Sequence, residues 1–407
     1  MSTLAVTAKP IESRSSGYDI RVLNLCAQLP GEVHLIVVPV PVLDEGTSER
    51  SLSTSAVFAT TETTPVLTHQ RAAPLRHLRL SDDHFLRHTS ARDLRVARRQ
   101  IDRAVRDRGV ERVVAFGSEI AEVVATIDSV PVVLDVCDSR SLTMRRRAEG
   151  ATDRSPLQRL KSSIDLWRTE ATEARLPGRF RCVTTVSGPD TDQVRRLAGD
   201  AANVLTVPNG VDEVFLAPPL RAPDAHGVVF WGNLSFEPNQ DALRFFLDEV
   251  YEPFLKAWGV PFRVLGPHAP AWLAQRAAAD ALLCLDGFVP DLRESLSSSA
   301  VMVNPMRLGS GLKNKVLEAF AMGIPVVSTH RGIEALQPVQ DGTEVFLADE
   351  PASFAARVRD LLDDVKKQEE VGTAARLLVE RRHRWDAIGV TWRQVVTGRA
   401  AAMDDGA

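Results

Sequence analysis

Short apolar runs rich in β-branched residues alternate with longer amphipathic segments along the whole chain. Such alternation predicts parallel sheets covered by helices on both faces, an α/β fold. The predicted strands cover residues 4–7, 33–38, 112–116, 130–135, 182–186, 203–207, 227–230, 262–265, 282–285, 301–304, 325–328 and 345–347. Helical spacing of apolar residues is found in segments such as 91–108, 240–249, 311–322 and 352–362.

The strands form two series, which predicts two Rossmann-like lobes facing a central cleft. Proline and loop residues mark the break, at Pro208-Asn209-Gly210 and again over residues 217–223. Proline lacks a backbone donor, so this segment is expected to link the lobes and not to pack. The predicted division is 1–211 for the first lobe, 212–224 for a linker, 225–380 for the second lobe and 381–407 for a last helix and tail. The Ser/Thr-rich residues 41–81 are interpreted as a loop or weak strands, and the tail from residue 400 as frayed.

Composition excludes several classes of protein. The chain has 407 residues, 44% hydrophobic and 25% charged, which is typical of globular proteins. Residues 1–205 carry 29 Lys and Arg against 26 Asp and Glu, so the density of positive charge is too low for a nucleic-acid binder. The four cysteines lack CxxC spacing, and neither a secretory signal nor a membrane-spanning apolar run is evident. We therefore expect a cytoplasmic protein.

A glycine loop between a predicted strand and a predicted helix is the most informative feature. Gly309 and Gly311 precede a helix that carries Lys315 and Glu318. Glycines let the backbone approach a ligand, and the first turn of a helix presents unpaired N–H groups, a combination that binds phosphate. Arg307 and Lys315 would add charge-assisted bonds, and Glu318 would accept from hydroxyl groups. Taken alone, the loop is better explained by a tight turn before a solvated helix.

Further segments agree with one family in order and spacing. They are Gly17–Arg21 (GYDIR), Val207–Asp212 (VPNGVD), Phe230–Leu234 (FWGNL) followed by Pro238-Asn239, Leu265-Gly266, Gly287–Val289 (GFV) and Gly323–Val327 (GIPVV). Together with the glycine loop they resemble glycosyltransferase family 4, also called group 1, whose members have the two-lobed GT-B fold. The resemblance is strong over residues 205–365 and thin in the first lobe.

The resemblance implies an enzyme that moves a hexosyl unit from a nucleotide-sugar to an acceptor hydroxyl or amine with retention of configuration. The nucleotide-sugar is a substrate, and neither a cofactor nor a metal is implied. The second lobe would bind the donor, the first the acceptor, and a helix over residues 385–396 would cross back to the first lobe. The resemblance leaves the acceptor and the oligomeric state open.

The family's functional positions can be carried over to this chain. Gly17 would approach the donor diphosphate, although residues 16–19 also form a helix-capping pattern. The remaining implied donor contacts are Phe288 and Val289 at the base, Glu318 at the ribose, Gly309, Ser310, Gly311 and Leu312 at the sugar and phosphates, and Lys313. Arg307 and Lys315 are the implied catalytic cations.

The chain departs from the family pattern at three positions. Ser310 stands where many members have a Glu, and Asn233 and Asn239 stand where many have an Arg and a Lys. Positive charge at the diphosphate would then have to come from Arg307, Lys313 or Lys315. These departures keep a catalytically silent partner subunit open as an alternative, and a nucleotide-sugar epimerase shares the expected fold.

The first lobe offers weaker signals. Asp135, Asp138 and Glu119 follow predicted strands and are candidates for the acceptor side, with a turn-forming Asp as the favoured alternative. Arginines along residues 91–108 could contact anionic lipid. A helix packed on the core is the favoured interpretation, so peripheral membrane contact is not favoured. Asp190 and Asp192 form a DxD pair that is better explained as the acidic first turn of a helix than as a metal site.

Overall fold

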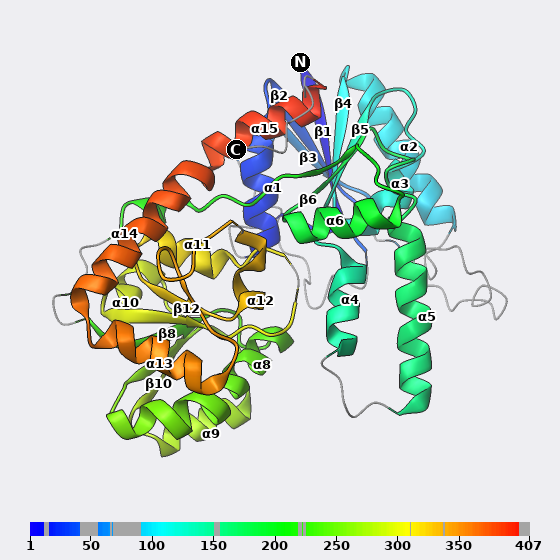
Figure 1. The fold of residues 1–407 in the computed structure, drawn as a ribbon. Helices are drawn as coiled ribbons and strands as arrows, with labels where there is room; N and C mark the ends of the chain where they lie inside the picture. Colours follow the sequence, from blue (N-terminus) through cyan, green and yellow to red (C-terminus); the bar gives the residue numbers. More distant parts are fainter. Residues whose placement is uncertain are drawn as a thin grey trace. The chain divides into compact units, whose positions relative to one another are not determined.

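A computed structural model describes residues 1–11, 16–40, 56–65, 67, 91–149, 155–218, 222, 225–309, 311–336 and 338–398. The chain divides into two units (Figure 1). Unit 1 comprises Met1–Pro208 and Ile388–Ala407, and unit 2 comprises Asn209–Ala387.

Both units alternate strands with helices. The strands are β1 (Ser2–Thr7), β2 (Glu32–Val37), β3 (Thr60–Thr63), β4 (Arg112–Phe116), β5 (Val132–Cys137), β6 (Cys182–Thr185), β7 (Val204–Thr206), β8 (His226–Trp231), β9 (Phe262–Leu265), β10 (Leu283–Gly287), β11 (Ser299–Asn304), β12 (Val326–Ser328) and β13 (Phe346–Leu347). The α-helices are α1 (Gly17–Ala27), α2 (Ala91–Asp107), α3 (Ala121–Val124), α4 (Arg140–Glu149), α5 (Pro156–Glu173), α6 (Gly188–Leu197), α7 (Glu213–Leu216), α8 (Glu237–Phe245), α9 (Ala271–Ala279), α10 (Leu292–Ser297), α11 (Asn314–Ala321), α12 (His330–Ile333), α13 (Pro351–Leu362), α14 (Val365–Arg382) and α15 (Trp385–Thr397). The 3₁₀ turns are Ser118–Ile120, Lys256–Trp258 and Glu334–Leu336, and a π-helix spans Phe246–Leu255.

Unit 1 is built on a seven-stranded parallel sheet in the order β3-β2-β1-β4-β5-β6-β7. Residues that alternate along each strand face opposite sides of the sheet. One face, with Leu4 and Leu134, packs against Ala97 and Ile101 of α2. On the other face Phe116 of β4 meets Trp392 of α15, with ring centroids 6.2 Å apart. The end of the chain therefore packs in the same unit as its beginning.

A buried ion pair ties α1 to the middle of this sheet. The guanidinium of Arg21 donates to both carboxylate oxygens of Asp135 on β5, at 2.8 and 2.6 Å. Thr184 of β6 donates to the same carboxylate at 2.7 Å, and the two charged side chains are 2% and 0% exposed. Two charges removed from water stabilise a fold only when each is fully hydrogen-bonded, and this bidentate geometry meets that condition.

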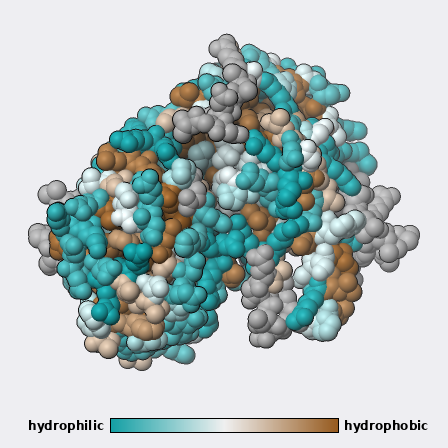
Figure 2. Space-filling view, viewed as in Figure 1, coloured by the Kyte–Doolittle hydropathy of each residue, from teal (hydrophilic) through white to brown (hydrophobic). Residues whose placement is uncertain are grey.

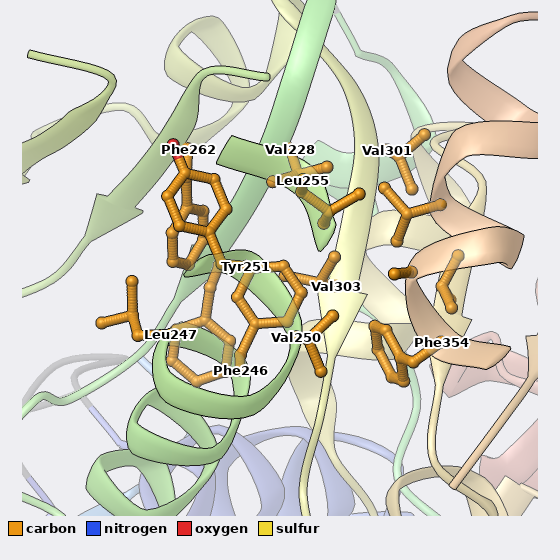
Figure 3. Packing of buried hydrophobic residues seen from close by; sticks show 14 of the residues in the cluster. Val228, Phe246, Leu247, Val250, Tyr251, Leu255, Phe262, Val301, Val303 and Phe354 are labelled. Carbon is orange, nitrogen blue, oxygen red and sulfur yellow. The ribbon is translucent and has the colours of Figure 1, made fainter. Parts of the chain in front are cut away.

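Unit 2 is built on a six-stranded parallel sheet in the order β10-β9-β8-β11-β12-β13. Val228 and Phe230 of β8 pack on one face, with α8, the π-helix and α13, whereas Val229 and Trp231 pack on the other, with α11 and α14. Figure 3 shows the first of these cores, in which the ring of Phe246 lies 4.9 Å from that of Phe262.

Most predicted elements are confirmed, with boundaries within a few residues. The twelve predicted strands correspond to β1, β2 and β4–β13. Strand β3, within the segment interpreted as a loop or weak strands, was not singled out because its four residues, TTET, contain no apolar side chain. The rest of residues 41–81 lies largely outside the described residues, as does the tail from residue 400.

The predicted linker packs on unit 2 where the structure describes it. Phe215 of α7 packs against the core of unit 2, and the carbonyl of Leu216 in α7 accepts a 2.7 Å bond from Arg376 of α14. Among the described residues after α7, Pro218 is in neither a helix nor a strand, and the apolar residues of α7 before it pack with α11 and α14.

We predict that Asp135→Ala destabilises unit 1 by about 3–5 kcal/mol, because it leaves the buried guanidinium of Arg21 without its counter-charge. Chemical denaturation followed by circular dichroism measures the loss. The matched control is Glu122→Ala, which breaks the half-exposed pair with Arg179 and should cost no more than about 1 kcal/mol. Equal losses in the two variants would show that burial of the Arg21 pair does not matter.

Candidate functional site

The candidate site lies where the strand order of unit 2 changes direction. The chain passes from β8 outward to β9 and β10, then returns to the other side of β8 as β11. In parallel sheets a crevice opens at such a point, beyond the carboxyl ends of the strands, and ligands bind there. The loops that follow β8 and β11 both begin at this edge of the sheet, which brings Gly232 and the Gly309 loop together.

Glycines terminate three adjacent strands at this edge. Gly232, Gly266 and Gly287 follow or end β8, β9 and β10, with φ of +150°, +139° and +68°, in the region that L-residues rarely adopt. A Cβ on Gly266 would collide with the carbonyl oxygen of Gly232. The edge is therefore lined by backbone, and a ligand can approach it closely.

Lys315 of α11 reaches into this edge. Its ammonium donates to the amide oxygen of Asn239 at 2.8 Å and lies 3.9 Å from the centre of the Phe230 ring. A Cβ on Gly232 would lie 3.4 Å from the same nitrogen, so the glycine leaves the space that the lysine uses. Burial, with a smaller contribution from Lys313, lowers the pKa of Lys315 from its ordinary value to about 7.

Asn239 is oriented at both ends of its side-chain amide. Its Nδ2 donates to the carbonyl of Asn233 at 2.8 Å, which turns its oxygen toward Lys315. The two asparagines that stand in place of the family's cations therefore form a holder for a cation from another helix. The sequence identified both departures but could not show this contact, which joins residues 76 positions apart.

Glu318 lies one turn further along α11, on the face covered by Trp231. The indole N–H of Trp231 donates to the Glu318 carboxylate at 2.7 Å. Burial raises the pKa of Glu318, while this hydrogen bond and the charge of Lys315 lower it. Trp231 was not predicted as a site residue. In the sequence, a tryptophan in an apolar strand cannot be distinguished from any other aromatic residue of the core, even when its N–H group contributes to a site.

Two helices begin at this edge without a side-chain cap. The N-cap residues are Phe236 for α8 and Lys313 for α11, and neither side chain accepts a hydrogen bond from the first turn. The first N–H groups of a helix require an acceptor, and an anion is a favourable one. Asn209 of the VPNGVD segment donates to Asn314 at 3.0 Å and so fixes the start of α11.

The glycines of the loop before α11 have positive φ, a conformation that favours glycine. Gly309 and Gly311 have φ of +91° and +72°, and Lys313 folds back to donate to the carbonyl of Gly311 at 3.1 Å. Leu312 is partly buried against the core of unit 2. Ser310 lies outside the described residues. The structure thus brings Gly309, Gly311 and Lys313 to the same loop, and their contacts with donor stay a prediction.

Arg307 is paired with acidic side chains. Its guanidinium bonds Asp241 at 2.9 Å and Glu249 at 3.4 Å, and it lies 4.5 Å from the ring of Phe245. The side chain is 42% exposed. Two carboxylates neutralise this cation, whereas the hydrogen-bond acceptor of Lys315 is a neutral amide. A catalytic role for Arg307 stays a prediction.

Phe288 and Val289 follow β10 at the same edge of the sheet. Phe288 is 72% exposed, an unusual position for a large aromatic ring, and Val289 packs partly against the core. A base could stack on the ring or bond the backbone here. Their role at the base stays a prediction.

In unit 1, Gly17 opens α1, and the Ser16 hydroxyl accepts from the backbone N–H of Asp19 at 3.2 Å. The structural alternative for residues 16–19, a helix cap, is therefore present. Contact of Gly17 with a diphosphate stays a prediction.

The acceptor-side candidates differ in what they can contact. Asp135 is fully buried and bonded to Arg21, Thr184 and Cys137, so it is not available to an acceptor in this conformation. Asp138, just beyond β5, is exposed, and Glu119 follows the neighbouring strand β4 and is partly exposed. Because β4 and β5 are adjacent, Asp138 and Glu119 come from neighbouring strand ends.

In the first half of the chain, the favoured interpretations of residues 91–108 and of the Asp190–Asp192 pair agree with the structure. Helix α2 packs on the core, and Asp190 lies in the first turn of α6, where it accepts from the Ser139 N–H at 2.9 Å while Asp192 is exposed. Within the described ranges no three His, Cys, Asp or Glu side chains gather closely enough to hold a metal ion. Nor, in that part of the chain, is any helix long and apolar enough to span a bilayer.

The chain is similar in fold to solved structures of glycosyltransferases of the GT-B type. HepE of Anabaena in complex with UDP has a TM-score of 0.67 at 15% identity, with 98% of this chain and 100% of HepE covered. Sucrose-phosphate synthase of Thermosynechococcus elongatus has a TM-score of 0.68 at 15% identity over 98% and 99% of the two chains. WaaG, a glycosyltransferase involved in lipopolysaccharide biosynthesis, has a TM-score of 0.63 at 13% identity over 98% and 100%. The protein has the GT-B fold.

Part of the sequence of unit 2 matches a family model. Residues 225–364 match the family model described as glycosyl transferases group 1. No curated protein matches the chain in sequence. The resemblance to the group 1 glycosyltransferases is therefore confirmed, and it is carried by the unit that contains Lys315 and Glu318.

We predict that Glu318→Gln stabilises unit 2 more at pH 8 than at pH 5. A carboxyl whose pKa is raised by folding favours the folded state only while it is protonated, so its cost grows as the pH rises above the unfolded value. The glutamine keeps an acceptor for Trp231 and carries no charge. Melting temperatures of parent and variant across this range test the expectation, and a difference that is independent of pH would contradict it.

Proposed function

We propose that this protein transfers a hexosyl unit from a nucleotide-sugar to an acceptor hydroxyl or amine, and that unit 2 binds the donor diphosphate at Lys315. One observation carries the proposal. A partly buried lysine, hydrogen-bonded only to a neutral amide among its described contacts, lies at the strand-order reversal of a parallel sheet, beside two helices that begin without side-chain caps. This arrangement fits an anion with two phosphates.

Lys315 would have its largest effect on the leaving group. When the bond from sugar to phosphate breaks, negative charge grows on the departing diphosphate. A lysine already held beside that charge, together with the N–H groups of α8 and α11, stabilises it without reorganisation. These groups can act without a metal, so we propose a metal-independent enzyme that requires no cofactor.

Glu318 would orient the nucleoside. Its carboxylate lies one turn from Lys315 on α11 and is kept in place by Trp231. A carboxylate so held accepts hydrogen bonds from two ribose hydroxyls. Because HepE was solved in complex with UDP and with UDP-glucose, these are the first ligands to test.

The acceptor would bind in unit 1, with Asp138 and Glu119 as candidate contacts at the ends of β5 and β4. Retention of configuration follows from the family resemblance. In that case the leaving phosphate helps to take the acceptor proton, and no dedicated base is needed.

Turnover separates this proposal from its rivals. The protein is incubated with a panel of nucleotide-sugars, with and without a panel of acceptors, in EDTA, and products are followed by mass spectrometry. We expect nucleoside diphosphate and glycosylated acceptor together. An isomerised nucleotide-sugar without acceptor would identify an epimerase, and binding without any turnover would favour a silent partner subunit.

We predict that Lys315→Gln weakens nucleoside diphosphate binding by about 1.5–3 kcal/mol, the range for hydrogen bonds to charged groups, which is roughly 10- to 150-fold in Kd. Calorimetry with UDP, GDP and ADP measures the change. Lys366→Gln on α14, where the lysine side chain is 84% exposed, is the matched control and should bind like the parent. Unchanged affinity in Lys315→Gln would remove the basis of the proposal.

We also predict that nucleotide-sugar binding takes up a proton. The free protein holds Lys315 with a pKa of about 7, and an adjacent diphosphate raises that pKa, since it favours the charged form. Affinity should therefore be highest below pH 7 and fall above it, by up to about tenfold per pH unit. A nucleotide-sugar suits this test because both its phosphates are esterified and do not titrate near neutrality. Calorimetry in buffers of different ionisation enthalpy detects the proton, and the signal should vanish in Lys315→Gln.

A further inference from the structure

Unit 1 contains the same kind of reversal of strand order that marks the candidate site of unit 2. Its chain passes from β1 outward to β2 and β3, then returns to the other side of β1 as β4. Ligands bind at such a point, beyond the carboxyl ends of the strands. The hydroxyl of Tyr18, in the first turn of α1, donates to the carbonyl of Phe116 at the end of β4 at 2.9 Å. We call Lys9, Tyr18 and residues 117–119 the reversal edge of unit 1.

Glu119 is the acidic side chain of the reversal edge. Gly117 has φ of +101°, and a Cβ on it would collide with the Glu119 carboxylate, so this carboxylate lies against bare backbone at the end of β4. Burial raises the pKa of Tyr18, with further contributions from Cys137 and Glu119, which places the Glu119 charge within electrostatic reach of the phenol. Within the part of the chain that the structure describes, Glu119 has neither a hydrogen bond nor an ion pair.

The nearest charges on β1, α1 and β5 are matched by opposite ones. The ammonium of Lys9 lies 3.4 Å from the carboxylate of Asp19, and 4.9 Å from the centre of the Tyr18 ring. The carboxylate of Asp135 is neutralised by the buried guanidinium of Arg21. These pairs therefore leave no net charge for a ligand at this edge.

The residues that follow β5 do not change the sign of the edge. Burial raises the pKa of the Cys137 thiol, so this group is neutral, and Asp138 and Arg140 carry opposite charges. Figure 2 shows apolar side chains gathered on α5, a helix to which no residue of the reversal edge belongs. The reversal edge is thus polar, and its unmatched charge is the negative charge of Glu119.

We propose that the acceptor carries a protonated amine that binds Glu119 at the reversal edge, and that a hydroxyl of the same molecule receives the hexosyl unit. This inference rests on the proposed function and names the class of its acceptor. An ammonium donates charge-assisted hydrogen bonds to a carboxylate and matches its charge, whereas a hydroxyl supplies only the hydrogen bond. A phosphate or carboxylate on the acceptor would be repelled, so the same side chain selects against anionic acceptors.

The bound ammonium is not the group that is glycosylated, because a protonated nitrogen has no free electron pair. In the transfer, the bond from the anomeric carbon to the phosphate oxygen breaks, and a bond from that carbon to the acceptor hydroxyl oxygen forms. The hydroxyl proton passes to the leaving phosphate, and the ammonium keeps its protons. Loss of Glu119 should therefore raise the KM for the acceptor more than it lowers kcat.

A binding experiment tests the recognition without turnover. The full chain is titrated with glucosamine, N-acetylglucosamine and glucuronate in a slightly acidic buffer, and binding is followed by ligand-observed NMR. Glucosamine should bind at least about tenfold more tightly than N-acetylglucosamine, the effect of one hydrogen bond between charged groups, and glucuronate most weakly. The preference should disappear in Glu119→Gln and persist in the matched control Glu122→Gln, whose carboxylate pairs with Arg179. Absence of glucosamine binding by the parent would overturn the proposal, as would a preference that survives in Glu119→Gln.

Turnover then separates this inference from the proposed function. The best acceptor of the turnover panel is compared with its N-acetylated derivative, and acetylation should raise KM at least about tenfold in the parent but not in Glu119→Gln. Circular dichroism and donor affinity should be the same in parent and variant, which excludes misfolding. Efficient transfer to an acceptor without an amine would overturn the inference while supporting the proposed function. Binding of glucosamine that depends on Glu119, without transfer to any acceptor, would support the recognition and contradict the proposed function.

Discussion

The candidate site of unit 2 is centred on a positive charge at the edge of its sheet that has a neutral hydrogen-bond partner. Lys315 extends from α11 toward the end of β8, where Gly232 leaves room for its ammonium and Asn239 accepts from it. Partial loss of hydration makes the charged form costly, as the pKa near 7 indicates. Charged side chains with strongly shifted pKa values are common at functional sites, where a bound anion can offset the free energy lost by burying the charge. The first turns of α8 and α11, which lack side-chain caps, favour the same kind of ligand.

Charge serves a different purpose in unit 1. The carboxylate of Asp135 is saturated by Arg21, Thr184 and Cys137, and it joins α1 to the sheet instead of facing a ligand. The two units thus illustrate two outcomes for a charged side chain at the end of a parallel strand. When the counter-charge comes from within the chain, as for Asp135, the group is structural. Lys315, whose hydrogen-bond acceptor is a neutral amide, is the group that we propose for a substrate.

Much of this could be predicted from sequence, and the exceptions have physical reasons. Apolar runs identified the strands because buried parallel strands are apolar on both faces, and β3 was not singled out because its TTET residues are not. The glycine loop and Glu318 were predicted because local backbone chemistry and family resemblance agree there. The contact between Lys315 and Asn239, the hydrogen bond from Trp231 and the pairing of Arg307 with Asp241 join residues far apart in the chain, and no local pattern encodes them.

The most direct measurement is a crystal structure of the protein with the nucleotide-sugar that it binds. The account predicts a diphosphate oxygen within about 2.7–2.9 Å of the Lys315 nitrogen, the distance of a charge-assisted hydrogen bond, with the Asn239 bond exchanged or shared. The ribose should lie at Glu318, beyond the ends of β8 and β11. A diphosphate bound elsewhere, with Lys315 still bonded only to Asn239, would contradict the central claim.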